Sequence, residues 1–308
     1  MWSFSAAKTF KKCQRQWYYK NCLANWKAKD IHRHKAYLLS KLQSISSWRG
    51  SIVDSVISEV IVPTLKAKGT PSLTVAQQRA KELFDRQLKF ARQHPLHQQG
   101  LSPSQVGSDF AVFHCMEYGG KIPETEIKKA KAEIDQALAN LFNMPEVWSE
   151  LKTAQYLVTQ RALSFSHTGE TVRAVPDLIA FYRNKPPLII DWKVHFSGVY
   201  RALNQLGIYA LALTRGKPHK DFPKLSKWEV TDLQLLEIQL LTNKIRRYQL
   251  DEVRIAEIDN FMAESISAMQ LIVGEAKKST LAPMEFLTAS SPETCQFCNY
   301  QSICWESA

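Results

Sequence analysis

The sequence lacks the segments that would anchor it in a membrane or direct it through one. No run of about eighteen apolar residues occurs along its 308 positions, so no transmembrane helix is expected. The N-terminal segment has no apolar stretch of the kind that secretory signals carry. Internal repeats and long low-complexity tracts are also missing. With 45% hydrophobic and 22% charged residues, we expect a cytoplasmic globular protein without a membrane partner.

Acidic residues are nearly absent from the first part of the chain. Residues 1–50 carry eleven lysines or arginines but a single acid, Asp30, and the whole chain has a net charge of +11. A basic segment with interleaved aromatic residues suits a phosphate backbone and unstacked bases. The alternative is an amphipathic helical region whose lysine face is only solvated. The interleaved aromatic residues are Trp2, Trp17, Tyr18, Tyr19, Trp26, Tyr37 and Trp48.

Apolar residues recur at helical spacing through much of the first half of the chain. The pattern predicts helices over residues 5–26, 49–69, 74–94 and 126–142. The last two segments are also rich in residues that favour helices. Residues 1–150 are therefore expected to be mainly helical.

The pattern changes to that of strands near the middle of the chain. Alternating and β-branched runs separated by turn residues predict three strands between residues 154 and 194. A helix over 197–215, one or two further strands over 228–242 and a helix over 251–276 follow. These elements predict an α/β or α+β fold with a small mixed central sheet, flanked by additional helices.

Three charged residues interrupt the apolar run of the expected strands. Asp191 and Lys193 are two residues apart, so their side chains point to the same face of a strand. Asp177 comes from the preceding strand and can lie opposite them. Neighbouring carboxylates repel each other unless a cation such as Mg²⁺ or Mn²⁺ binds their oxygens, and a nearby lysine can serve an attacking water. The alternative is an ordinary strand start at Asp177 and a surface ion pair.

These residues, in this order, resemble the core of the PD-(D/E)XK nuclease superfamily. Pro176 and Asp177 match the first part of its motif, and the Asp-Trp-Lys of residues 191–193 matches the second. The resemblance implies a restriction-endonuclease-like core and Mg²⁺- or Mn²⁺-dependent cleavage of DNA. It implies that Asp177, Asp191 and the backbone carbonyl of Val194 hold the cation, while Lys193 assists the water.

The next expected helix strengthens this resemblance. Gln205 and Tyr209 resemble the Q-x-x-x-Y motif of the RecB-type branch of the superfamily. At a spacing of i and i+4 they share one helical face, and Arg201 lies one turn earlier on that face. We therefore expect these three residues, together with Lys193, to contact DNA, with Gln205 and Tyr209 also counted among the catalytic residues.

One position departs from the RecB-type pattern. These nucleases usually carry a metal-binding histidine four residues after a glycine, whereas Gly50 is followed here by Asp54. An aspartate can also bind a hard cation, so the resemblance implies Asp54 as a third metal ligand. The alternative is an ordinary polar position on an amphipathic helix.

Three of the six cysteines are clustered near the C-terminus. Cys295, Cys298 and Cys304 have the spacing C-x2-C-x5-C, which in a reducing compartment favours a metal or iron–sulfur site over disulfides. A closed site needs a fourth ligand, and Cys13 is the main candidate. Cys22 and Cys115 have no neighbours at ligand spacing and are expected to be buried thiols, with Cys22 as the reserve ligand.

One N-terminal and three C-terminal cysteines resemble the ligands of iron–sulfur RecB-type nucleases. The CRISPR-associated adaptation nucleases and the nuclease domain of AddB have this arrangement, although Gln14 replaces their usual proline. The resemblance implies a 4Fe-4S cluster held by Cys13, Cys295, Cys298 and Cys304. Zinc bound by the same four cysteines is the alternative.

The resemblance extends over the whole chain and implies a single nuclease unit over 1–308. Its parts are a helical region over 1–150 with the first cluster ligand, a nuclease core over 151–240, and a C-terminal helix with a cysteine-rich tail over 241–308. We expect a deoxyribonuclease acting on single strands or DNA ends in repair, recombination or prokaryotic defence. Exonuclease or endonuclease action and cleavage of RNA stay open.

A protein of another class is the main alternative to this enzyme. The chain would then be a non-catalytic or partner-dependent DNA-binding or scaffold protein with a zinc site, including a CRISPR-type adaptation factor. In the nuclease as in this alternative, we expect the extra helices of residues 64–150 to bind a protein partner or to form a DNA channel.

Overall fold

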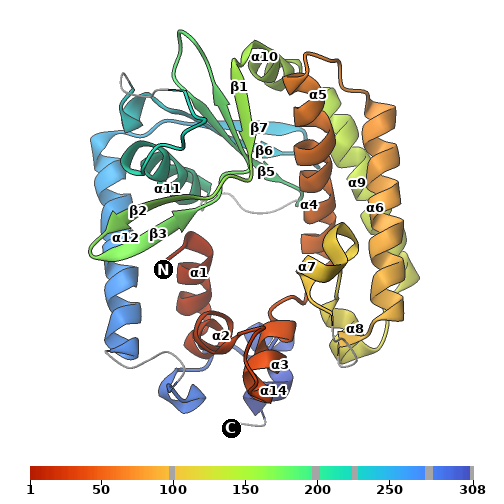
Figure 1. Ribbon diagram of the computed structural model, residues 1–308, viewed down its shortest axis with the longest axis vertical. Helices are drawn as coiled ribbons and strands as arrows, with labels where there is room; N and C mark the ends of the chain where they lie inside the picture. The colour runs from red at the N-terminus through yellow and green to blue at the C-terminus, as the bar shows by residue number, and fades with distance from the viewer. Residues whose placement is uncertain (97–100, 196–201, 224–227, 275–279, 306–308) are drawn as a thin grey trace. The chain divides into compact units, whose positions relative to one another are not determined.

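The computed structural model describes residues 1–96, 101–195, 202–223, 228–274 and 280–305 (Figure 1). The chain divides into two compact units, each assembled from segments that are far apart in the sequence. The sheet unit consists of Met1, Ile45–Phe84 and Glu124–Met262. The terminal unit consists of Trp2–Ser44, Asp85–Pro123 and Ala263–Ala308.

A mixed five-stranded sheet forms the centre of the sheet unit. Its strand order is β1-β4-β5-β6-β7, in which only β5 and β6 are parallel. Because parallel neighbours need a crossover, helix α11 (Ala202–Arg215) connects them. The α/β fold with a small mixed sheet that the sequence predicts is thereby confirmed. The strands are β1 (Tyr156–Thr159), β4 (Leu178–Phe181), β5 (Leu188–Lys193), β6 (Gln234–Gln239) and β7 (Lys244–Tyr248).

The region from 154 to 194 contains five strands where three were expected. The backbone of Gln160 is left-handed, with a φ of 51°, and it ends β1 before the hairpin of β2 (Leu163–His167) and β3 (Glu170–Ala174) begins. Strand β7 was not expected either, because its sequence, KIRRY, is mostly charged. Charged residues are common on edge strands, where they discourage pairing with other chains.

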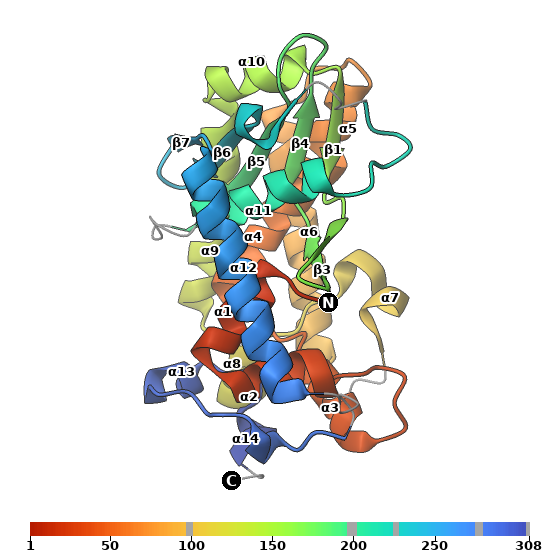
Figure 2. The same cartoon turned by 90° about the vertical axis from the view of Figure 1, so that its left-hand side faces the viewer.

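Helices cover both faces of the sheet within this unit. Helix α11 lies on one side, and α4 (Ile45–Val56) and α9 (Glu124–Phe142) lie on the other (Figures 1 and 2). The helix expected over 49–69 is present as α4, a π-helical turn at Ile57–Ile61 and α5 (Val62–Lys66). Its apolar stripe is buried, which explains why the helical period was readable in the sequence. Helix α10 (Pro145–Thr153) follows α9.

The long helices α6 (Leu73–Gln93) and α12 (Glu252–Val273) each contribute residues to both units. None of the helices in the described part of the chain is long and apolar enough to cross a membrane.

The terminal unit is built from short helices. The helix expected over 5–26 is interrupted at Cys13, whose backbone is extended, so that α1 (Phe4–Lys12) and α2 (Gln14–Tyr18) are separate. A π-helical turn at Tyr19–Leu23 follows α2. The other helices of four or more residues described in this unit are α3 (Ile31–Leu39), α7 (Pro103–Val106), α8 (His114–Gly119), α13 (Pro292–Gln296) and α14 (Gln301–Trp305).

Aromatic residues of the basic N-terminal segment form much of the core of the terminal unit. Tyr18 stacks on Phe286 with ring centroids 4.6 Å apart, and Tyr19 stacks on Tyr300 at 5.4 Å. The hydroxyl of Tyr18 also donates to the carbonyl of Leu281 at 2.7 Å. The proposal that the aromatic residues of this segment contact bases is therefore wrong for the five that are buried in their units, which are Trp2, Trp17, Tyr18, Tyr19 and Trp48.

A glycine at the end of α11 permits a close backbone approach and gives a test of the packing. A Cβ added at Gly216 would meet the carbonyl oxygen of Ala212 and would lie 2.8 Å from that of Ser164 in β2. Because both atoms belong to the backbone, we expect Gly216→Ala to lower the free energy of unfolding by about 1–3 kcal/mol in urea titrations.

Gly50→Ala is the matched control for this substitution. A Cβ at Gly50, inside α4, would meet nothing within 4 Å. Alanine favours helix over glycine, so this variant should keep its stability or gain up to about 1 kcal/mol. Equal losses in the two variants would contradict the packing at Gly216.

Candidate functional site

Two carboxylates meet where β4 begins and β5 ends. Leu178 pairs with Ile190 in the antiparallel register, so the residue before β4, Asp177, lies opposite Asp191. The backbone N–H of Trp192 donates to Asp177 Oδ2 at 2.9 Å, which holds this carboxylate against β5. Asp191 is only 1% exposed. The register of two strands therefore brings a pair of acids together in the interior.

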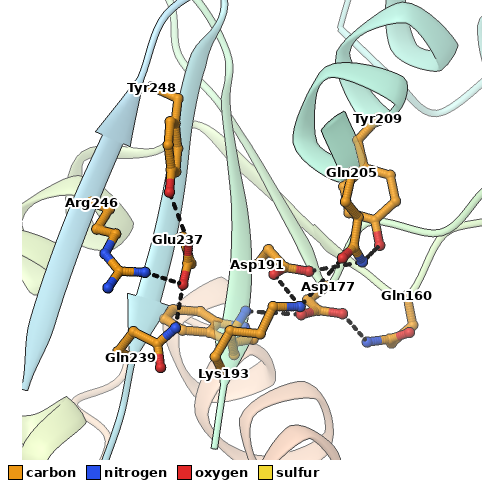
Figure 3. Close-up of polar contacts among 11 residues, drawn as sticks. Gln160, Asp177, Asp191, Lys193, Gln205, Tyr209, Glu237, Gln239, Arg246 and Tyr248 are labelled. Carbon is orange, nitrogen blue, oxygen red and sulfur yellow. Dashed lines mark hydrogen bonds and ion pairs between the residues drawn. The ribbon is translucent and has the colours of Figure 1, made fainter. Parts of the chain in front are cut away.

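Lys193 is the cation nearest to this pair. Its Nζ forms an ion pair with Asp191 Oδ2, as two residues on the same face of a strand can do. The same Nζ lies 3.5 Å from the side-chain oxygen of Gln205. Figure 3 shows Asp177, Asp191 and Lys193 converging on one point between β5 and α11.

Helix α11 supplies two further polar residues. Gln205 Nε2 donates to Asp191 Oδ1 at 3.2 Å and also to the hydroxyl of Tyr209, one turn along the helix (Figure 3). The predicted pair on one helical face therefore lies beside the acids and orients one of them. Arg201 lies outside the described residues.

Gln160 links a third acid, Asp54, to Asp177. Its Nε2 donates to both carboxylate oxygens of Asp54, at 2.9 and 3.0 Å, and to Asp177 Oδ1 at 3.3 Å. Asp54 therefore reaches the site from α4, from the opposite side of the sheet to Gln205. The alternating pattern around Gln160 predicted an uninterrupted strand, and only its left-handed backbone turns this side chain toward the acids.

Burial and mutual repulsion make these acids hard to ionise. Burial, followed by the charges of Asp191 and Asp54, raises the pKa of Asp177 to about 7. Burial is also the main cause that raises the pKa of Asp54 to about 6 and the pKa of Asp191 above its ordinary value. Lys193 acts in the opposite direction on Asp191. If all three acids were ionised, their negative charge would exceed the single positive charge of Lys193.

The backbone after β5 is held by a buried arginine that the sequence patterns did not single out. Arg49 of α4 is 7% exposed and donates to the carbonyl oxygen of Val194. It also pairs with Glu133 of α9 and donates to the hydroxyl of Ser46 at 3.2 Å. The Val194 carbonyl, expected in the metal shell, is therefore already a hydrogen-bond acceptor.

A second polar cluster lies beside the first, on the next strand. Glu237 of β6 is aligned with Asp191 of β5 in the parallel register and is fully buried. Arg246 pairs with it at 3.1 Å, the hydroxyl of Tyr248 donates to it at 2.9 Å, and Gln239 donates from the same strand (Figure 3). The strand pattern did not reveal this cluster, although a glutamate within an apolar strand and arginines in the next run were its signals.

Of the four cysteines that were predicted as ligands, Cys298 is influenced by the other three in the terminal unit. Burial, followed by the charges of Cys13, Cys304 and Cys295, raises the pKa of the Cys298 thiol to about 11. Cys13 also accepts a hydrogen bond from the backbone N–H of Gln16 at 3.3 Å. Of the two cysteines expected to be buried thiols, Cys22 is buried, but the prediction is wrong for the half-buried Cys115.

Neither the acids of the sheet unit nor the four cysteines form a preformed metal site among the described residues. In the described part of the chain, no three histidine, cysteine, aspartate or glutamate side chains are arranged to hold a metal ion. At the acids, the amide of Gln160 and the ammonium of Lys193 take up carboxylate oxygens that a cation would need. A cation bound by these acids would compete with the Gln160 amide and the Lys193 ammonium for the same oxygens.

Comparison with known proteins gives a family match over nearly the whole chain. The model of the PD-(D/E)XK nuclease superfamily matches residues 1–305. Twelve solved chains also match, including "Crystal structure of SSO0001", at 15% identity, with 75% of this chain and 98% of that chain covered and a TM-score of 0.31. A similarity that low supports no transfer of function. No curated protein matches the chain.

The ion pair in the second cluster should make a large contribution to stability. Arg246→Met removes the only charged partner that Glu237 has in the described residues and leaves a buried carboxylate. We expect the free energy of unfolding to fall by about 3 kcal/mol, because breaking a buried pair from one side costs about 3–5 kcal/mol and Arg246 is itself 30% exposed.

Arg247→Met is the control on the same strand. Arg247 pairs with Glu146, and both side chains are about half exposed, so its loss should cost less than about 1 kcal/mol. Urea denaturation of both variants measures the difference. If Arg246→Met lowers the free energy of unfolding no more than Arg247→Met does, the buried pair contributes no more to stability than the exposed pair.

Proposed function

Because the chain belongs to the PD-(D/E)XK nuclease superfamily, we propose that it is a metal-dependent deoxyribonuclease that hydrolyses phosphodiester bonds. The convergence of the buried Asp191 with the half-buried Asp177 and Lys193 is the observation that supports this most directly. Two acids and a lysine are the groups that metal-assisted phosphodiester hydrolysis needs. Gln205 and Tyr209 beside them support assignment to the RecB-type branch.

We propose that the acids hold Mg²⁺ or Mn²⁺, the cations that nucleases of this superfamily typically use. Asp177 and Asp191 would be the main ligands, with Asp54 and the Val194 carbonyl completing the set. Their carboxylate and carbonyl oxygens are the ligands that a hard cation prefers. When bound, the cation would polarise the phosphate and compensate the charge that the acids share.

The other residues of the site act on water and DNA. The Lys193 ammonium can orient the attacking water and stabilise negative charge that develops on the phosphate. Gln205 orients Asp191 through its amide and, with Tyr209, is positioned to contact the DNA strand. Single strands or DNA ends are the proposed substrates, in repair, recombination or prokaryotic defence.

A second function is favoured by the hydrogen bonds that already occupy the acids. Gln160 and Lys193 partner the carboxylates, and Asp54 stands where RecB-type nucleases usually carry a histidine. A chain with this arrangement could bind DNA without cutting it, or could cut only when a partner rearranges the site. CRISPR-type adaptation factors are one class that would behave in this way.

We further propose that Cys13, Cys295, Cys298 and Cys304 hold a 4Fe-4S cluster, with a four-cysteine zinc site as the alternative. Burial is the main cause that raises the pKa of Cys298 and that of Cys304, and the charges of Cys13 and Cys295 act in the same direction on both, which supports the grouping. Because burial raises the pKa of Cys298, its thiolate is disfavoured until a metal binds and releases the proton. Such a group would join the two ends of the chain within the terminal unit.

The nuclease proposal is tested with end-labelled single- and double-stranded DNA and Mn²⁺. Lys193→Ala and Asp191→Asn should each reduce cleavage by about 100-fold or more, because the first removes the group that stabilises developing charge and the second removes a proposed metal ligand. Lys152→Ala removes an exposed lysine of α10 and should cut as well as the wild type. Full cleavage by Lys193→Ala would refute the proposed role of this residue.

The cluster proposal is tested by anaerobic purification and metal analysis. The wild type should contain iron and sulfide and show a broad visible absorption band, which Cys298→Ser should lose. Cys22→Ser should keep the band, because Cys22 is not among the proposed ligands. A colourless protein with one equivalent of zinc would replace the cluster by the zinc site.

A further inference from the structure

Two aromatic residues of the basic N-terminal segment remain outside the core of the terminal unit. Trp17, Tyr18 and Tyr19 are at most 4% exposed, whereas Trp26 and Tyr37 are only half-buried. The rings of Trp26 and Tyr37 lie 5.4 Å apart at an angle of 51°. They therefore form a small aromatic surface that solvent reaches.

Helix α3 and the loop before it hold these rings in place. His34 and Tyr37 are three residues apart on one face of α3, and the ring of His34 lies 4.7 Å from that of Trp26. The loop is tied to the helix by the backbone N–H of Asn25, which donates to the carbonyl of Arg33 at 3.1 Å. We call Trp26, His34 and Tyr37 the aromatic platform.

Lysines adjoin the platform without local compensation. The Nζ of Lys41 lies 4.6 Å from the centre of the Tyr37 ring. Burial, followed by the charge of Lys20, lowers the pKa of Lys41. Neither lysine forms an ion pair with a carboxylate of the described residues. Asp30, the only acid of residues 1–50, is engaged in capping α3 through the N–H of Arg33. An incoming anion would relieve the repulsion between the two lysines.

We propose that the aromatic platform is a binding site for single-stranded nucleic acid, separate from the acids of the sheet unit. Unpaired bases stack on aromatic faces whatever their sequence, and the ammonium groups of Lys41 and Lys20 neutralise the neighbouring phosphates. In a duplex the base faces are already stacked on one another, and an acidic peptide has no bases that could stack on the rings. The proposal rests on the proposed function only in taking nucleic acid as the ligand.

The rings are tested by binding without cleavage. Fluorescence anisotropy of a labelled oligothymidylate is measured in EDTA, so that no divalent cation supports hydrolysis. Trp26→Ala and Tyr37→Ala should each weaken binding by about 5- to 100-fold, the loss of one stacked base. Tyr37→Phe keeps the ring and should bind within about twofold of the wild type. Circular dichroism confirms that each variant is folded, and Trp26→Leu, which keeps apolar bulk but has no ring, replaces Trp26→Ala if that variant is not.

The lysine is tested by the salt dependence of the same binding. Lys41→Ala should reduce the slope of log affinity against log salt by about 0.7, the value for one phosphate contact on a single strand. Lys89→Ala removes an exposed lysine of α6 in the same unit and should leave the slope unchanged. Equal slopes for Lys41→Ala and the wild type would overturn the assignment of Lys41.

Competition experiments distinguish stacking on the platform from binding by charge alone. Unchanged binding by the double variant Trp26→Ala/Tyr37→Ala would overturn the proposal, as would duplex DNA or polyglutamate competing as well as the oligothymidylate. The nuclease proposal fails independently of this one. Binding that depends on the platform in a wild type that cuts no DNA would reject the nuclease and keep the platform.

Discussion

The antiparallel pairing of β4 with β5 is the constraint on which the candidate site depends. That register sets Asp177 opposite Asp191, and the N–H of Trp192 then holds the Asp177 carboxylate in place. A shift by one residue would turn Asp191 and Lys193 to the other face of the sheet. The apolar residues of both strands make such a shift costly, because they are buried on both sides. Core packing thus positions the charged residues.

The acidic side chains at the centre of the sheet unit are compensated by partners close to each of them, and they form two neighbouring groups. Asp191 has Lys193 and Gln205, Asp177 and Asp54 share Gln160, and Glu237 on the next strand has Arg246 and Tyr248. Figure 3 shows the two groups side by side on neighbouring strands. In the group at Glu237, the single carboxylate is satisfied by several hydrogen-bond donors, so no further cation is needed there. The group at Asp177 carries three acids and stays short of positive charge, which is the physical basis for expecting a cation there.

The terminal unit uses one segment for two purposes. The same basic stretch supplies buried rings to the core and leaves Trp26 and Tyr37 at the surface beside uncompensated lysines. Stacked pairs such as Tyr18 with Phe286 join the first helices to the C-terminal segment of this unit. A metal group held by cysteines from both segments would strengthen the same connection.

The sequence by itself determined the fold class, the superfamily and the residues whose spacing follows a helix or strand period. The spacing predicts that Asp191 and Lys193 share one face, because residues two apart on a strand do so. It predicts the same for Gln205 and Tyr209, which are four apart on a helix. Such relations are local, so composition and spacing are enough to find them. Asp54 as a metal ligand and a 4Fe-4S cluster at the four cysteines needed the resemblance to a family.

Only the tertiary structure decided which distant residues meet and which side chains are buried. Gln160 faces the acids because its backbone is left-handed, and Arg49 reaches Val194 because α4 packs on the sheet. Glu237 is aligned with Asp191 through a parallel pairing that spans a whole crossover helix. Trp26 and Trp17 belong to one basic stretch, yet only packing makes one a surface residue and the other a core residue. Register, backbone conformation and burial arise from contacts between remote segments, which no local pattern records.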